Sequence, residues 1–119
     1  MNPQLEGVED LPGTYPFDLR ASYRARRLNR FLNNLRYPDC RARFVADEAA
    51  ACREAGLSAE ETEMVLKRQW LKMIQYGVVL FCIEKILRVL KLTNLELYAM
   101  LRGETFEEFL KTRKVPDAR

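Results

Sequence analysis

The chain has 119 residues, of which 48% are hydrophobic, and a net charge of +3 at neutral pH. This length supports one domain with a modest core. The longest apolar run, residues 78–83, is far shorter than the roughly 20 residues that a membrane-spanning helix needs. The sequence contains no histidine, which excludes an imidazole base and a two-histidine-one-carboxylate iron site within this chain.

The cysteines point to free thiols. Cys40, Cys52 and Cys82 lack the CxxC spacing of a zinc site, and an odd number of scattered cysteines is typical of a protein in a reducing compartment. The first ten residues show neither the basic segment nor the apolar segment of a secretory signal. We therefore expect a cytoplasmic protein without a membrane anchor. Because the sequence has no histidine, we also expect that the isolated chain is not an enzyme.

Residues 1–17 are predicted to form an irregular N-terminal arm. They hold three of the five prolines and two of the five glycines, and this composition prevents a regular helix. Leu11, Tyr15 and Phe17 are its candidate apolar anchors. Because free apolar side chains are unfavourable in water, the arm should lie on its own domain or on a partner. A helical domain is expected over residues 18–114, and residues 115–119 should fray.

Within residues 18–114 the patterns predict helices only. Apolar residues at positions 28, 31, 32 and 35 recur with helical spacing, and Pro38 stands where a helix can start. Ser58, Thr93 and Thr105 each precede a glutamate by three residues, which is the pattern of a capping box. The predicted helices span residues 18–26, 28–36, 38–55, 59–76, 78–92, 94–101 and 106–114. The fold class is therefore all-α, a compact multi-helix bundle with residues 78–92 at its centre.

Arginine is concentrated near the N-terminus, with eight residues between positions 20 and 43. Such a segment can bind nucleic acid, an acidic protein partner or an anionic substrate, or form a solvated face. The aromatic residues between the arginines, Tyr23, Phe31, Tyr37 and Phe44, are expected mostly in the core, which disfavours stacking on RNA bases. Arg20, Arg24 and Arg27 are predicted to lie on one side of the first helix and to form a partner interface beside Leu11 and Phe17.

The adjacent acids Asp47 and Glu48 are not expected to act as a catalytic carboxylate pair. Neighbouring residues on a helix point roughly 100° apart, so their side chains do not converge on one substrate atom. We expect them instead to pair with arginines such as Arg41, Arg43 or Arg53.

Short motifs in a shared order run through most of the chain. They begin with Leu11-Pro12-Gly13-Thr14 and Phe17, and they continue with Leu28-Asn29, Phe31, Leu35, Arg41, Arg43-Phe44, Ala46-Asp47-Glu48, Met73-Ile74, Gly77, Lys85, Met100, Gly103, Thr105 and Glu108-Phe109. In this pattern the chain resembles the small (alpha) subunit of protocatechuate 4,5-dioxygenase, a class III extradiol ring-opening enzyme. It departs from the family at Gly77-Val78-Val79, where a Gly-Gly-Asn turn is common.

The resemblance implies an all-helical subunit that packs on a larger beta subunit and covers the mouth of its active site. By the same resemblance, the beta subunit carries the Fe(II), and this chain carries no cofactor and no catalytic or metal-binding residue. The substrate would be protocatechuate or a related catechol acid, such as a gallate relative. The segment near Thr93, Leu95 and Tyr98 would act as a lid at the substrate entrance. The competing interpretation is that Leu95, Leu97 and Tyr98 only pack the bundle.

Two further functions stay open at the level of the sequence. The first is a stand-alone helical adaptor that keeps the fold and recognises another protein or a peptide. The second, which the spacing of the aromatic residues disfavours, is a helical module that binds nucleic acid through the arginine segment.

Overall fold

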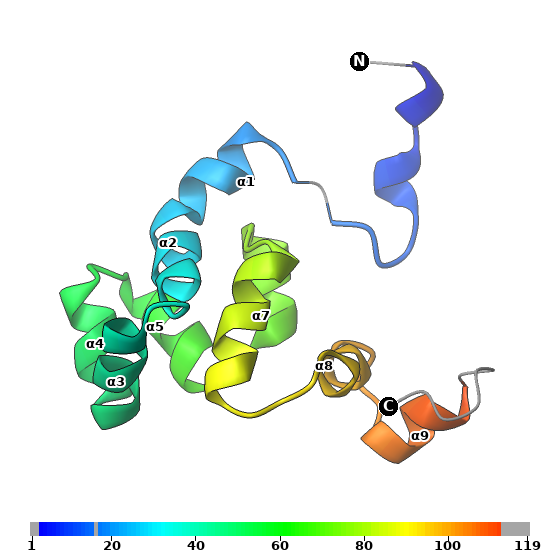
Figure 1. The fold of residues 1–119 in the computed structure, drawn as a ribbon. Helices are drawn as coiled ribbons and strands as arrows, with labels where there is room; N and C mark the ends of the chain where they lie inside the picture. The colour runs from blue at the N-terminus through cyan, green and yellow to red at the C-terminus, as the bar shows by residue number, and fades with distance from the viewer. Residues whose placement is uncertain (1–2, 16, 113–119) are drawn as a thin grey trace.

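The computed structural model describes residues 3–15 and 17–112 and is all-helical over them (Figure 1). Two short 3-10 turns, Pro3–Leu5 and Val8–Asp10, lie in the arm. The α-helices that follow in the described ranges are α1 (Leu19–Arg24), α2 (Arg26–Asn34), α3 (Pro38–Ala46), α4 (Glu48–Glu54), α5 (Ala59–Leu66), α6 (Trp70–Tyr76), α7 (Leu80–Val89), α8 (Asn94–Leu101) and α9 (Phe106–Lys111). The predicted fold class is confirmed.

The core is built around α2 and α7, which share the most extensive contact between any two helices described. Leu28 and Leu32 of α2 are fully buried, as are Ile83, Ile86 and Leu87 of α7. Their spacing of three and four residues places them on one face of each helix. The central role that the sequence predicts for residues 78–92 is therefore confirmed.

The structure divides two predicted helices. The helix expected over residues 38–55 breaks at Asp47, whose backbone is extended and whose side chain accepts a hydrogen bond from the Ala50 N–H at 3.0 Å, so Asp47 caps α4. The helix expected over residues 59–76 breaks at Arg68, which has a positive φ of 55°. Helix-forming sequence continues on both sides of each break. The sequence pattern therefore does not show where the first helix ends and the next one begins.

Three threonine and serine caps were predicted, and all three hydroxyls accept a hydrogen bond from the expected backbone N–H. Only at Ser58 does the glutamate also bond back to the backbone N–H of the cap, which completes a capping box. At Thr93 and Thr105 the hydroxyl donates instead to the carboxylate of Glu96 and of Glu108, respectively. These two sites are hydroxyl caps rather than reciprocal boxes.

Gly77 joins α6 to α7 in a conformation that only glycine adopts comfortably. Its φ is 122°, and a Cβ at this position would lie 2.4 Å from the carbonyl oxygen of Ala21 in α1. The Asn29 side chain clamps the same link, since its amide donates to Gly77 O at 3.2 Å and its oxygen accepts from the Val79 N–H at 3.1 Å. Helices α1, α2, α6 and α7 therefore meet at this glycine.

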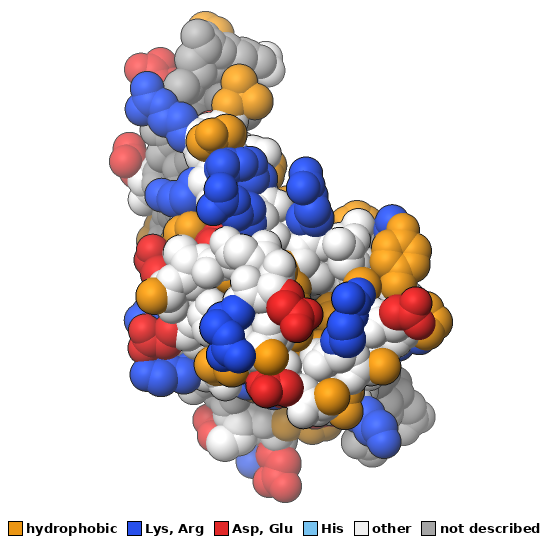
Figure 2. All heavy atoms as spheres, turned by 90° about the vertical axis from the view of Figure 1, so that its left-hand side faces the viewer, with side chains coloured by type: hydrophobic (Ala, Val, Ile, Leu, Met, Phe, Trp, Pro, Cys, Tyr) orange, Lys and Arg blue, Asp and Glu red, His pale blue; other side chains and the backbone are white. Residues whose placement is uncertain are grey.

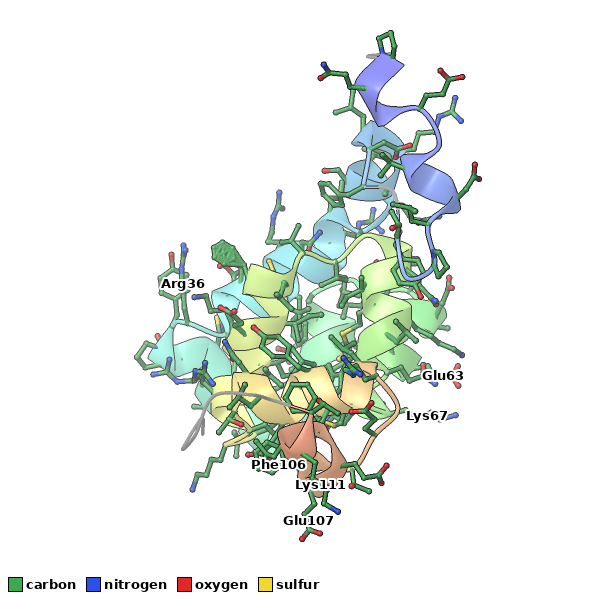
Figure 3. The ribbon with its side chains drawn as sticks, turned by 90° about the vertical axis from the view of Figure 1, so that its right-hand side faces the viewer. Arg36, Glu63, Lys67, Phe106, Glu107 and Lys111 are labelled. Carbon is green, nitrogen blue, oxygen red and sulfur yellow. The ribbon has the colours of Figure 1, made fainter. Side chains whose placement is uncertain are left out.

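The molecule is less compact than a typical single domain with the same number of residues. Its radius of gyration is 16.0 Å, whereas the scaling for a compact domain gives about 13.5 Å. Figures 1 and 3 both show the arm projecting from the rest of the chain, with only α1 linking it to the bundle. The division into an arm, a domain and a tail stays a prediction, and the tail, residues 115–119, lies outside the described residues.

Candidate partner interface

Apolar side chains of the arm and of α1 are left in solvent. Leu11 and Phe17 are each 56% exposed, Leu19 is 89% exposed and Tyr23 is 67% exposed, and Tyr15 is exposed too. We call these five residues the unburied apolar set. Neither the bundle nor another described segment covers them, and a series of this kind in a small protein is typical of a surface that a partner covers.

Helix α1 is nevertheless fixed at both ends. Asp18 caps its first turn by accepting a hydrogen bond from the Ala21 N–H at 2.9 Å, and this bond lowers the pKa of the Asp18 carboxyl. At the other end, the Arg24 guanidinium donates to the carbonyl oxygens of Tyr76 at 2.8 Å and of Gln75 at 3.3 Å. The helix is therefore a firm platform whose apolar side chains still point to solvent.

These bonds give Arg24 a structural role that the sequence did not predict. Its guanidinium satisfies the last carbonyl groups of α6 and lies 5.1 Å from the centre of the Tyr76 ring. Below it, the Tyr76 hydroxyl donates to the buried carboxylate of Glu61 at 3.1 Å. Burial, followed by the neighbouring Glu61 charge, raises the pKa of Tyr76. Arg20 and Arg27 have no such bond among the described residues, so they are better probes of an interface than Arg24.

Two of the four aromatic residues in the arginine segment differ from the prediction. Phe31 and Phe44 are buried and pack edge to face, with their ring centres 6.0 Å apart. Tyr23 and Tyr37 are exposed and lie beneath the guanidinium groups of Arg26 and Arg36, at 3.8 and 4.6 Å from the ring centres. The local tyrosine-arginine contact stabilises these rings on the surface.

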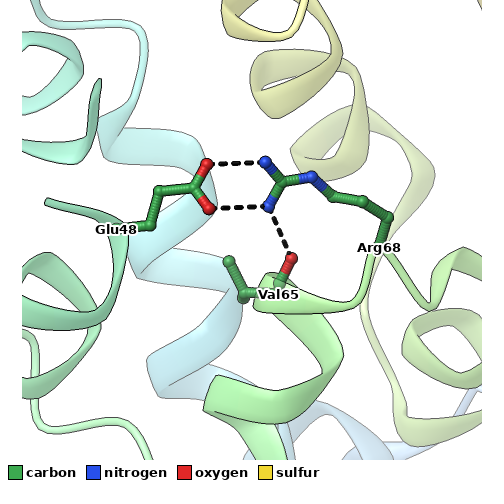
Figure 4. Close-up of polar contacts among 3 residues, drawn as sticks. All are labelled: Glu48, Val65 and Arg68. Carbon is green, nitrogen blue, oxygen red and sulfur yellow. Dashed lines mark hydrogen bonds and ion pairs between the residues drawn. The ribbon is translucent and has the colours of Figure 1, made fainter. Parts of the chain in front are cut away.

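The prediction that the adjacent acids pair with arginines is confirmed for Glu48 but not for Asp47, and the arginine is not one of those named. Asp47 serves as the cap of α4, and Glu48 pairs with Arg68 through two hydrogen bonds of 2.6 and 3.1 Å (Figure 4). Arg68 also donates to Val65 O at 2.9 Å, which holds its positive φ in place. The pair joins α4 to the α5–α6 break and leaves Arg41, Arg43 and Arg53 free of these acids. Since Arg68 is distant in sequence from Glu48, no local spacing signals this contact.

The predicted lid residues lie at the start of α8 and within it. Thr93 is exposed at the start of α8, whereas Leu95 and Tyr98 are half-buried, and Tyr98 packs against the core together with the fully buried Leu97. Arg88 of α7 ties the segment down by donating to Leu92 O at 3.0 Å and to the side chain of Asn94 at 2.9 Å. Of the three predicted lid residues, only Thr93 is therefore exposed.

No group of three or more acidic, cysteine or histidine side chains able to hold a metal ion occurs in the described part of the chain. Cys52 and Cys82 are buried. Burial raises the pKa of Cys52 to about 11 and also raises the pKa of Cys82, which disfavours the thiolate form that binds metals. The described side chains therefore include no cluster of the kind that holds iron. None of the helices in the described ranges has the length and apolarity needed to cross a membrane.

Comparison with known proteins identifies the class. The family model described as "Aromatic-ring-opening dioxygenase LigAB, LigA subunit" matches residues 28–114, which is most of the chain. The protein therefore belongs to the family of LigA subunits of aromatic-ring-opening dioxygenases, as the sequence motifs had indicated.

A particular relative is a gallate dioxygenase of Pseudomonas putida (strain KT2440). It is 46% identical over 113 residues, which cover 95% of this chain and 33% of the relative. The chain thus spans a third of the length of that protein. The matched family range begins at Leu28, so the arm and α1 precede it.

Proposed function

We propose that the chain is the non-catalytic small subunit of an extradiol ring-opening dioxygenase and packs on a larger, Fe(II)-bearing beta subunit. The observation that carries the proposal is the match to the LigA subunit family over residues 28–114 in a chain without histidine. The ligands of a two-histidine-one-carboxylate iron site must then come from a partner. The length of the gallate dioxygenase, three times the matched part, supports a larger catalytic portion.

The unburied apolar set and the arginines beside it would supply the contact. Covering Leu11, Phe17 and Leu19 with a partner removes apolar area from water, and this burial is the main driving force of association. Arg20 and Arg27 are exposed nearby in sequence and suit the polar rim of such an interface. The chemistry of ring opening would belong to the metal in the beta subunit, and this chain would exclude water from the active-site mouth.

The family and the relative support a proposal for the substrate class. A catechol acid, protocatechuate or a gallate relative, is the expected substrate, and the identity to a gallate dioxygenase favours the trihydroxylated ring. We assign the entrance lid to the start of α8, and the exposed Thr93 is its best candidate for substrate contact. A cytoplasmic location stays a prediction.

Co-expression with a beta subunit, followed by size-exclusion chromatography and an assay of ring opening, tests the assembly. We expect one complex that contains both chains, with activity that the isolated small subunit lacks. A small subunit that stays free of the beta subunit would favour the stand-alone adaptor. Bound Fe(II) and turnover by the isolated chain would contradict the proposal outright.

The lid is tested in the assembled enzyme by Thr93→Phe. Thr105→Phe is a matched control, because Thr105 caps α9 with the same two hydrogen bonds as Thr93 makes in α8. If the lid lies at the entrance, Thr93→Phe changes the ratio of kcat/KM values between protocatechuate and gallate, and Thr105→Phe leaves that ratio unchanged. Equal ratios in both variants, with the complex intact, would rule out the lid.

A further inference from the structure

The surface formed by α2, α3 and α4 contains a groove with a basic rim. Figure 2 shows this side of the molecule, on which Lys and Arg side chains stand among Asp and Glu side chains over white and orange surface. Arg27 and Arg30 of α2 and Arg43 of α3 line the groove, and Glu54 of α4 is the acid in its lining. Three guanidinium groups therefore face one carboxylate.

The three arginines are available for a ligand. Among the described residues, none of them takes part in an ion pair, and Arg27 and Arg30 donate no side-chain hydrogen bond. Arg43 donates to the Cys40 thiol at 3.5 Å, which is a weak acceptor. Guanidinium groups stay charged at every physiological pH, so three of them around one groove repel each other and favour an anion between them.

The floor of the groove is apolar. Phe31 and Leu35 are buried beneath it, and Ala51 and Ala55 of the α4 end close the far side. The groove measures about 330 Å³, which is at the lower end of the roughly 300–1,000 Å³ of small-molecule sites. The groove therefore has room for a ligand with one compact apolar body and one or two charged groups.

The sequence explains why the groove forms here. Arg27, Arg30 and Asn34 follow one stripe of α2, and Cys40 and Arg43 are one turn apart on α3. The turn before Pro38 starts α3, whose Phe44 packs on Phe31 of α2, and the break at Asp47 brings α4 against α3. Small residues on α4 leave the space open, because Ala51 and Ala55 cannot fill it.

We propose that this groove binds a small organic acid, with its carboxylate held by Arg27, Arg30 and Arg43 and its apolar body on Phe31 and Leu35. The charge of the rim selects the carboxylate, since charge-assisted bonds from arginine to carboxylate are the strong ones. The apolar floor selects a compact hydrocarbon body over a bare ion. Anion binding by the groove does not depend on the proposed function, but Arg27 is common to the groove and to the candidate partner interface, because it lies four residues after Tyr23 of the unburied apolar set. Arg30 and Arg43 belong to the groove only, so changes at these two residues separate the two sites.

Titration calorimetry on the full chain, with benzoate as the probe, tests the proposal. Two comparison compounds separate the two contributions, because benzamide lacks the charge of benzoate and acetate lacks its apolar ring. We expect saturable binding of one benzoate at millimolar concentrations or below, and binding weaker by about tenfold for either comparison compound. Benzamide that binds as tightly as benzoate, or no saturable benzoate binding, would overturn the proposal without any variant.

Variants assign the binding to this groove. Arg30→Gln with Arg43→Gln should weaken benzoate binding by about tenfold or more, and Arg53→Gln, the same change on the exposed side of α4, should leave it unaltered. Glu54→Gln should strengthen it by about twofold to fivefold, because the acid in the lining is removed. Equal affinity in the double variant and the wild type would place the benzoate elsewhere and refute the assignment.

Cys40 offers an independent readout. It lines the groove and is half-buried, whereas Cys52 and Cys82 are buried. Benzoate should slow the alkylation of Cys40 by iodoacetamide, and benzamide at the same concentration should not. If benzoate leaves the rate of Cys40 alkylation unchanged while calorimetry shows binding, the groove is not the binding site.

Discussion

The bundle buries many of its apolar side chains, whereas the arm and α1 leave most of theirs exposed to solvent. In the bundle, Leu28, Leu32 and Ile83 are completely buried, and the links between helices are held by specific side chains such as Asn29. In the arm and α1, Phe17 and Leu19 face solvent, although Asp18 caps the start of α1 and Arg24 at its end is bonded to α6. The difference shows that exposure here does not come from a loosely held helix. A helix that is fixed and still exposes its apolar side chains is suited to receive a partner.

The same contrast separates the residues that should control stability from those that should control assembly. Changes at the meeting point of α1, α2, α6 and α7 should destabilise the protein. Changes in the unburied apolar set should leave the fold intact and affect only what binds there. The predictions below run from the largest expected effect on stability to the smallest.

Gly77→Ala should have the largest effect. Its φ of 122° is unfavourable for alanine, and the new Cβ would lie 2.4 Å from Ala21 O in the backbone of α1. We expect a loss of about 3 kcal/mol or more in the free energy of unfolding. Gly103→Ala is the control, because Gly103 also has a positive φ, 71°, but no atom lies within 4 Å of the added Cβ. It should cost about 1 kcal/mol. Urea denaturation measures both, and equal losses would contradict the close approach.

Asn29→Ala should cost about 2 kcal/mol. The change leaves the half-buried carbonyl of Gly77 and the N–H of Val79 without their partner. Asn33→Ala, on the same helix, removes a half-buried asparagine whose side chain makes no hydrogen bond to the described residues. It should change stability by less than about 0.5 kcal/mol. Comparable losses in the two variants would show that the clamp contributes little.

Arg24→Gln should cost about 1 kcal/mol, because it removes the guanidinium that satisfies the last carbonyl groups of α6. Arg20→Gln, an exposed arginine on the same helix, should have no measurable effect on stability. Thermal unfolding of the two variants distinguishes them. If Arg20→Gln destabilises the protein as much as Arg24→Gln does, the positive charge of α1 contributes to stability and the bonds from Arg24 to the carbonyl groups of α6 do not.

The last prediction concerns the pH dependence of stability and not its value at neutral pH. Burial raises the pKa of Cys52 from 9.0 to about 11, so the folded state holds this proton more tightly than the unfolded state. Its contribution to stability is fully present below pH 9 and is lost as the pH rises from 9 towards 11. Cys52→Ala should therefore reduce the fall in stability over that interval, measured by denaturation at each pH. Parallel pH profiles for the two proteins would count against this role of Cys52.

Local patterns predicted much of the fold. The helix starts at Asp18, Ser58, Thr93 and Thr105 each depend on residues within three positions, so the sequence shows them directly. The central helix was equally clear from its apolar spacing. The break at Asp47 was missed although its cap is as local as that of Asp18, because the alanine-rich residues on both sides favour one continuous helix. The break at Arg68 was missed because a positive φ at an arginine gives no local signal.

The candidate interface was predictable only in part. The exposed Leu11 and Phe17 agree with a role in binding a partner, which stays a prediction. The role of Arg24 could not be read from the sequence, since its acceptor Tyr76 O lies 52 positions away. The pair of Glu48 and Arg68 was missed for the same reason, with 20 positions between them. The groove between α2 and α4 also depends on distant contacts, although the stripe of Arg27, Arg30 and Asn34 is visible once α2 is known.

The central claim is that the exposed apolar side chains of the arm and α1 serve binding and not folding. The most direct test is the affinity of the double variant Leu11→Ala/Phe17→Ala for the beta subunit, with Val45→Ala as a control because Val45 is exposed on α3. We predict unchanged helix content and unfolding free energy, binding weaker by at least about tenfold in the double variant, and wild-type binding in the control. A folded double variant that binds the beta subunit as tightly as the wild type would contradict the account.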